Sequence, residues 1–261
     1  MRRTIISSLV IIAFIAVVVV NVLANTLPIN GVATGEVSDS YPDLFAPAGI
    51  TFSIWGLIYL LLGAYAVHQA LPATKRKEAL LNTIGVLFIA SSLANIAWLF
   101  SWHYDRIGLS LFFMVVLLYS LIRIADTLRE ERLSRKEFFF LRLPFSVYFG
   151  WITVATIANV TAFLVSANWN GWGVAEATWT IIILIVGAAI GITRALYDKS
   201  VPYLLVFVWA YTGILIKHLS AQGFFASYPG IIITAALCIA SFLAAITFLF
   251  IRKNGVLTRT S

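Results

Sequence analysis

The stretch TIISSLVIIAFIAVVVVNVLA, residues 4–24, contains no charged side chain. A helix needs about 20 mostly apolar residues to cross the hydrocarbon core of a bilayer, so this stretch is long enough to span one. Seven more apolar stretches follow, at roughly residues 48–71, 79–102, 107–125, 142–166, 177–196, 201–219 and 230–251. The sequence therefore predicts an all-α integral membrane protein with eight transmembrane helices.

The basic residues predict how the chain is oriented. Sixteen of the 18 Lys and Arg residues fall at the termini and in alternate connections, and only Arg106 and Lys217 lie on the other side. Because Lys and Arg resist translocation, both termini are predicted to be cytoplasmic. The first span is longer than the apolar core of a secretory signal, which favours its retention as a true span. We expect a multi-pass protein of a bacterial or archaeal cell membrane.

Composition narrows the classes of function. With 61% hydrophobic and 11% charged residues, the chain has no room for a soluble catalytic domain, so an enzyme is less expected than a non-enzyme. The net charge of +7 consists mainly of the basic residues that set the topology, and no nucleic-acid partner is expected. The single cysteine, Cys238, excludes an intramolecular disulfide. The sequence has no His, Cys and carboxylate cluster with metal-ligand spacing and no phosphate-binding loop, so it calls for no particular cofactor.

Three spans carry aromatic, amide and small residues at helical spacing, which places them on one face of each helix. These residues are Phe52, Trp55 and Tyr59 in the second span, Asn95, Trp98 and Trp102 in the third, and Pro144, Tyr148, Trp151, Ala155 and Asn159 in the fifth. At 1.5 Å per residue, Trp55, Asn95 and Asn159 share a depth of about 10 Å below the surface opposite the basic loops. These faces are predicted to point into the protein.

Two interpretations of these faces remain. The amides could simply join helices, through interhelical hydrogen bonds that contribute about 0.6 to 2 kcal/mol. Alternatively, flat rings beside a small residue form a slot for a planar apolar ligand. The rings around Ala155 favour the slot, and the candidate ligand-binding residues are Phe52, Trp55, Tyr59, Asn95, Trp98, Tyr148, Trp151, Ala155 and Asn159.

Residues 5–167 resemble the TspO family, the tryptophan-rich sensory proteins related to the mitochondrial translocator protein. The matching segments are PAGITFSIWGLIY at 47–59, NIAW at 95–98, LP at 143–144 and WITVATIAN at 151–159. The resemblance implies a five-helix bundle around a pocket for porphyrins or sterol-like molecules, with residues 25–47 as a lid. It implies that the pocket residues are Trp55, Asn95, Trp98, Tyr148, Trp151, Ala155 and Asn159. Some members are reported to break down porphyrin, so such a side activity is conceivable.

The chain departs from the family pattern in two places. Phe45-Ala46-Pro47 replaces the usual Trp and paired proline before the second helix, and three more spans follow from Thr178 onward. We therefore expect a five-helix bundle at 1–167 and a three-helix extension at 168–261. A small-residue step at Gly187 and Gly191 predicts close helix packing, within the chain or in a homo-oligomer.

Taken together, these features predict a TspO-like receptor or sensor. It would bind a planar hydrophobic ligand, such as a porphyrin or a sterol-like lipid, and its other partners would be membrane lipids. The alternative is a secondary transporter of a small hydrophobic or amphipathic molecule, because an eight-helix bundle is large enough for one.

Overall fold

The computed structural model describes residues 2–27, 29–72 and 74–257. In these ranges, eight helices are long and apolar enough to cross a membrane. They are α1 (Arg2–Thr26), α3 (Ile54–Ala70), α4 (Lys75–His103), α5 (Ile107–Arg129), α7 (Leu143–Ser166), α8 (Glu176–Asp198), α9 (Val201–Leu219) and α10 (Pro229–Leu257). Helices satisfy their backbone hydrogen bonds internally, as a bilayer requires. The eight predicted spans are confirmed.

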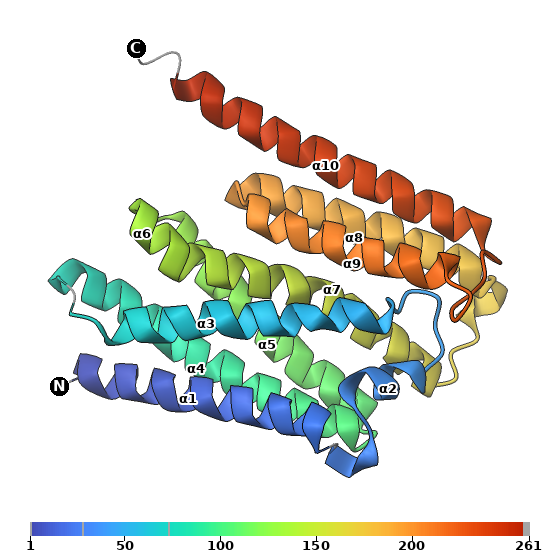
Figure 1. Cartoon of the computed structure of the whole chain (residues 1–261), viewed down its shortest axis with the longest axis horizontal. Coiled ribbons are helices and arrows are strands. Elements are labelled where there is room, and N and C mark those ends of the chain that lie inside the picture. The colour runs from blue at the N-terminus through green and yellow to red at the C-terminus, as the bar shows by residue number, and fades with distance from the viewer. Residues whose placement is uncertain (1, 28, 73, 258–261) are drawn as a thin grey trace.

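Five of these helices form a closed ring. Helix α1 packs against α3 and α4, α5 packs against α4 and α7, and α3 completes the ring through α7 (Figure 1). The helices that carry the aromatic and amide residues, α3, α4 and α7, are all members of this ring. Their inward faces can therefore meet at its centre.

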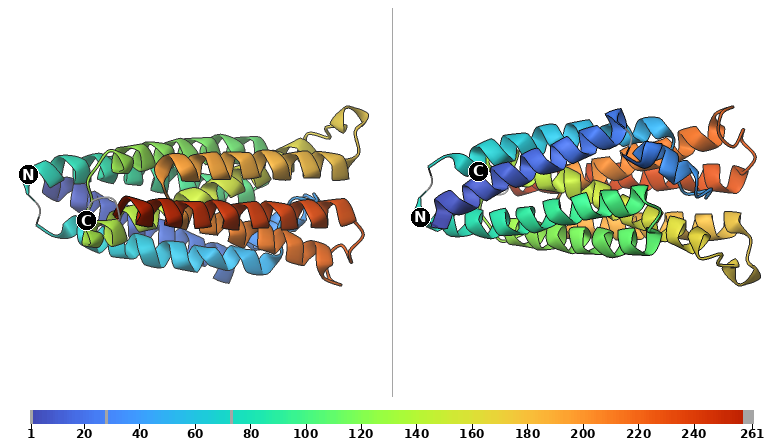
Figure 2. Two further views of the ribbon diagram at one scale, coloured as in Figure 1. Left: turned by 90° about the horizontal axis from the view of Figure 1, so that it is seen from above. Right: turned by 90° about the horizontal axis from the view of Figure 1, so that it is seen from below.

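The remaining three helices form a layer on one side of the ring. Helix α9 packs on α7, and α10 packs on α8 and α9 (Figures 1 and 2). The backbones of α7 and α9 approach closely at Gly150, where an added Cβ would lie 2.8 Å from the carbonyl oxygen of Tyr203. Gly187 and Gly191 face Tyr211 and Phe207 of α9, so the small-residue step packs within the chain.

Short helical segments shape the connections. These segments are η1 (Ile29–Gly31), α2 (Thr34–Asp39), η2 (Gly49–Ser53), α6 (Arg135–Glu137), η3 (Phe138–Arg142) and η4 (Gly171–Gly173). The second span covers Gly49–Ala70, close to the predicted 48–71, but its first residues form the 3-10 turn η2 and its α-helix starts at Ile54. The π-helical turn η3 precedes Pro144, whose nitrogen has no hydrogen for the helical bonding pattern.

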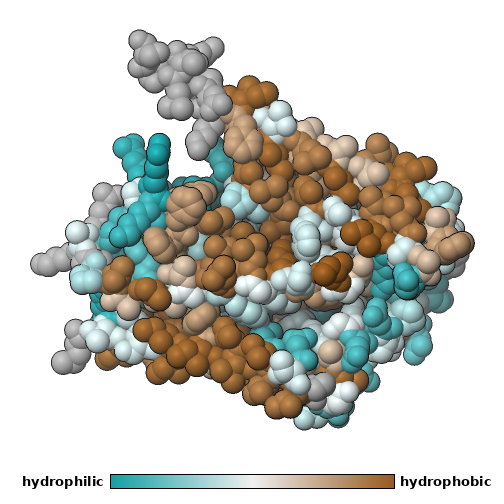
Figure 3. All heavy atoms as spheres, in the orientation of Figure 1, coloured by the Kyte–Doolittle hydropathy of each residue, from teal (hydrophilic) through white to brown (hydrophobic). Residues whose placement is uncertain are grey.

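The two ends of the bundle differ in charge. Apolar surface covers the length of the helices and hydrophilic residues gather at the ends (Figure 3). The start of α1 and the end of α10 lie at one end, here called the basic end, together with the predicted inner connections (Figure 2). The opposite end, here called the lid end, contains the connections 167–175 and 220–228 and residues 29–48, here called the lid segment. The predicted lid, 25–47, began too early, because α1 continues through Thr26. Arg106 and Lys217 lie at the lid end, as predicted.

Candidate functional site

Trp55 of α3 lies at the centre of an aromatic cluster inside the five-helix ring. Its ring stacks on Tyr59 at a centroid distance of 5.4 Å and on Trp98 of α4 at 6.5 Å. It meets Tyr148 and Trp151 of α7 edge-on, at 6.0 and 6.3 Å. Residues that helical spacing placed on one face of each helix therefore meet at one point between α3, α4 and α7.

Asn95 is fully buried and joins three helices. Its Nδ2 donates a hydrogen bond to the Tyr148 hydroxyl at 3.1 Å. Its Oδ1 accepts one from Nδ2 of Asn21 on α1 at 2.9 Å. Asn21 was missed as a site residue, although an amide in an otherwise apolar span signals a buried partner.

Asn159 makes a second polar junction, nearer the lid end. Its Oδ1 accepts a hydrogen bond from Nε1 of Trp98 at 2.9 Å, and its Nδ2 donates to Oγ of Ser110 on α5 at 3.0 Å. The two predicted amides therefore do not bond each other. Each one links neighbouring helices, which agrees with the interpretation that they join the bundle.

A small cavity lies between the aromatic cluster and the lid segment, with a volume of about 50 Å³. Six of the nine predicted site residues line it, together with three residues of the lid segment and three more from α4 and α7. These residues are Phe52, Trp55, Trp98, Trp151, Ala155 and Asn159, then Thr34, Ser38 and Pro47, then Trp102, Val154 and Ala158. None comes from residues 168–261 among those described.

The other three predicted residues lie behind the wall of the cavity. Tyr59 stacks on Trp55, while Asn95 and Tyr148 bond each other, and none of the three lines the cavity. Their role in the structure is to support the rings that do. Helical spacing in the sequence identified which residues share a face of each helix. It did not identify how deep along that face the cavity extends.

Two buried donors beside this cluster have no hydrogen-bond partner among the described residues. They are Nε1 of Trp151, which lines the cavity, and the hydroxyl of Tyr59. Trp151 is only 3% exposed, and a buried donor without an acceptor costs about 1 to 3 kcal/mol. The Trp151 indole is therefore available to an acceptor atom placed in the cavity.

The lid segment is tied to α4 on one side of the cavity. Nε1 of Trp102 donates a hydrogen bond to the Thr34 carbonyl at 3.2 Å, and Nε2 of His103 lies 3.0 Å from the Thr34 hydroxyl. Nδ2 of Asn30 donates to the His103 carbonyl at 2.9 Å. The start of the lid segment is therefore fixed to the end of α4.

On the other side, helix α9 of the extension holds the lid segment and η2. Lys217 pairs with Asp39 at 2.9 Å, and Nε2 of His218 donates to the Leu44 carbonyl at 2.9 Å. Two more hydrogen bonds join Ala48 N to the Gly213 carbonyl at 3.0 Å and Trp209 Nε1 to the Thr51 carbonyl at 2.9 Å. The described residues of the extension do not line the cavity, but they hold the lid segment and η2 in place.

One of three comparisons with known proteins finds a match. No curated protein and no solved structure matches the chain significantly. A family model described as TSPO-like protein matches residues 7–249, which continues past residue 167 through the last three spans. The chain therefore belongs to the TSPO-like protein family, as a multi-pass membrane protein.

Proposed function

We propose that the aromatic cavity binds a planar, largely apolar molecule that carries at least one hydrogen-bond acceptor, and that the protein is a receptor or sensor for it. The observation that carries the proposal is the buried Trp151 indole N–H, which lines the cavity without an acceptor among the described residues. A ligand carbonyl or carboxylate would satisfy this donor and remove its cost. A porphyrin with propionate groups is one molecule of this class.

The orientation of the rings supports a flat ligand. Trp55 and Trp98 stack at an interplanar angle of 28°, whereas Trp151 stands at 83° to Trp55. Aromatic pairs favour offset-stacked and edge-to-face contacts, so a planar guest could stack on one wall while its edge meets the other. Ala155 and Ala158 have the smallest side chains of the lining and leave room beside these rings.

The size of the cavity requires movement. Ligand sites are usually about 300 to 1,000 Å³, and the volume of about 50 Å³ in this structure is well below that. We therefore interpret the structure as a closed state, in which the lid segment must move before a porphyrin-sized ligand can enter. Ligand affinity would then include the cost of opening the lid.

Titration of the purified protein with protoporphyrin, followed by tryptophan fluorescence, tests this proposal. We expect saturable quenching, and the variant Trp151→Phe should weaken binding by about threefold to tenfold, because the N–H donor is lost while a smaller aromatic ring remains. Trp172→Phe is the matched control, since Trp172 is 77% exposed and lies outside the cavity. Equal affinity in wild type and Trp151→Phe would contradict the proposed role of the indole.

We further propose that the basic end faces the cytoplasm, as the positive-inside rule predicts. Replacing the buried Cys238 with alanine leaves a cysteine-free background for single-cysteine variants. In intact cells, cysteine at Phe225, at the lid end, should react with a membrane-impermeant maleimide. Cysteine at Glu130, at the basic end, should react only after the cells are opened. The reverse pattern would overturn the orientation.

A further inference from the structure

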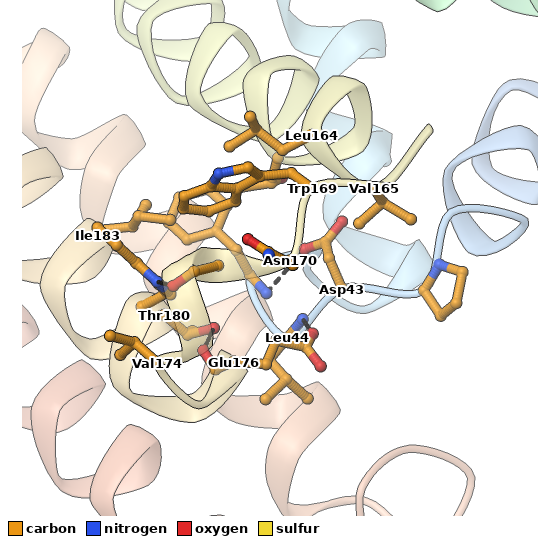
Figure 4. A pocket seen from close by; sticks show the side chains of 15 residues that line it. Asp43, Leu44, Leu164, Val165, Trp169, Asn170, Val174, Glu176, Thr180 and Ile183 are labelled. Atoms are coloured by element: carbon orange, nitrogen blue, oxygen red, sulfur yellow. Dashed lines mark hydrogen bonds between the residues drawn. The ribbon is translucent and has the colours of Figure 1, made fainter. Parts of the chain in front are cut away.

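A larger cavity lies at the lid end, separate from the aromatic one. Its volume is about 380 Å³, within the range of small-molecule sites. Its walls come from the lid segment, the end of α7, the connection after α7 and the start of α8 (Figure 4). No residue is shared between the linings of the two cavities.

One wall of this cavity is aromatic. Trp169 and Trp179 line it with ring centroids 5.1 Å apart, and Nε1 of Trp179 donates a hydrogen bond to the Gly171 carbonyl at 2.9 Å. Trp172 packs on both from outside, at 5.4 and 5.8 Å. The indole faces are therefore held in place, and such faces attract cations.

Two carboxylates also line the cavity. Asp43 is 9% exposed, and its Oδ1 accepts hydrogen bonds from the backbone N–H groups of Phe45 and Ala46, both at 2.8 Å. Its Oδ2 has no hydrogen-bond donor or ion-pair partner among the described residues. Glu176, at the first turn of α8, accepts a hydrogen bond from Leu44 N at 3.2 Å through Oε1. A carboxylate this buried calls for a positively charged partner.

The surroundings of the cavity are acidic although the whole chain is basic. The lid end carries five carboxylates, namely Glu36, Asp39, Asp43, Asp105 and Glu176, against the two basic side chains of Arg106 and Lys217. Lys217 is already paired with Asp39. The local field therefore favours cations at the cavity.

We propose that this cavity binds a small primary amine in its ammonium form, with the charge at the Asp43 and Glu176 carboxylates and the apolar part on Trp169. An ammonium with N–H groups can donate to the free Oδ2, which a quaternary ammonium cannot do. A lipid ethanolamine headgroup offers the same ammonium, but its phosphate would lie near two carboxylates. The proposal is therefore for a free amine without an attached anion.

The ionisation of Asp43 supplies a second signature. Burial, reinforced by the nearby Glu176, raises the pKa of Asp43 to about 6, while the Phe45 and Ala46 N–H groups and Lys217 oppose the rise. A bound ammonium favours the ionised carboxylate. Amine binding should therefore strengthen as pH rises from 5 to 7, a range in which an alkylamine stays protonated.

The test is isothermal titration calorimetry of the purified full-length protein with benzylamine. We expect saturable binding that is at least about tenfold weaker for benzyl alcohol, which has the same shape without the charge. Asp43→Asn and Glu176→Gln should each weaken benzylamine binding, and Asp43→Asn should also flatten the pH dependence. Glu36→Gln is the control, because Glu36 is exposed at the same end, lies outside the cavity, and its replacement can still accept the hydrogen bond from Ala33 N.

Each outcome decides the proposal. Equal binding of benzyl alcohol, unchanged affinity in Asp43→Asn, or no benzylamine binding by wild type between pH 5 and 7 would overturn it. Phosphoethanolamine binding as tightly as benzylamine would overturn the choice of a free amine. In Asp43→Asn, the amide oxygen can still accept the two backbone hydrogen bonds from Phe45 and Ala46, so the local fold is kept. The pH series uses the wild-type protein alone and is therefore an independent test. Protoporphyrin binding is measured separately, so failure of one site is distinguishable from failure of the other.

Discussion

Replacing Arg194 with methionine is expected to lower the free energy of unfolding by about 1 to 3 kcal/mol, because charge-assisted hydrogen bonds to two carboxylates are lost at a partly buried site. Arg194 lies on α8 at the basic end and is bonded to two carboxylates. Its Nη2 lies 2.7 Å from Oδ1 of Asp126 on α5, and its Nε lies 2.7 Å from Oδ2 of Asp198. The Asp198 side chain is 7% exposed, and its remaining ion-pair partner would be the Arg129 guanidinium, 3.9 Å away, while Arg142 stays bonded to the Asp198 backbone carbonyl.

Unfolding by denaturing detergent, followed by tryptophan fluorescence, measures this effect. The double variant Arg194→Met, Asp198→Leu should recover much of the loss, because an apolar pair often replaces a buried ion pair without cost. Lys199→Met is the matched control: Lys199 is exposed and makes no ion pair among the described residues, so its effect should stay within about 0.5 kcal/mol. Wild-type stability in Arg194→Met would mean that apolar packing alone holds α8 to the ring.

The sequence predicted most of the fold because the bilayer leaves few alternatives. A charge-free stretch such as 4–24 can only cross as a helix, and the basic residues cluster at one end whatever the packing of the helices. The differences occur where local chemistry acts on a helix end. The 3-10 turn Gly49–Ser53 and the π-helical turn before Pro144 leave no periodic signal in an apolar segment.

The candidate site was predicted in part for a similar reason. Helical spacing identifies a face, so Trp55, Trp98 and Trp151 could be grouped before their helices were placed. Spacing does not identify partners on other helices, and Asn21 and Ser110 were missed although each bonds a predicted amide. The position of Asn21 within an apolar span was a usable signal, whereas Ser110 had none.

The contribution of the extension could not be read from its composition. Its spans lack the amides that mark the first part of the chain, a composition typical of helices that pack outside a polar-lined ring. The described residues of the extension do not line the aromatic cavity, yet Trp209 bonds to η2 and His218 bonds to the lid segment. Both donate to backbone carbonyls, and a carbonyl acceptor is available at every residue, so no sequence pattern marks such a contact.

These contacts lead to a prediction about the rate of ligand entry, which rests on the proposed function. In the double variant Trp209→Phe, His218→Phe, the lid segment and η2 lose two side-chain hydrogen bonds to α9, while α9 keeps an aromatic ring at both positions. At about 0.5 to 1.5 kcal/mol for each bond, lid opening should become roughly fivefold to 150-fold more favourable. Stopped-flow quenching by protoporphyrin should show association faster by a similar factor, provided that lid opening limits entry.

The equilibrium affinity separates a loosened lid from a damaged cavity. If the lid must open before the ligand binds, a more favourable opening should raise the affinity or leave it unchanged, because less free energy is spent on opening. Damage to the ring cluster would instead lower the affinity without faster association. Thr212→Ala is the control on the same helix, since the Thr212 hydroxyl donates only to its own helix at the Val208 carbonyl. Unchanged association in the double variant would mean that the lid opens at its α4 side, where Trp102 and His103 hold Thr34.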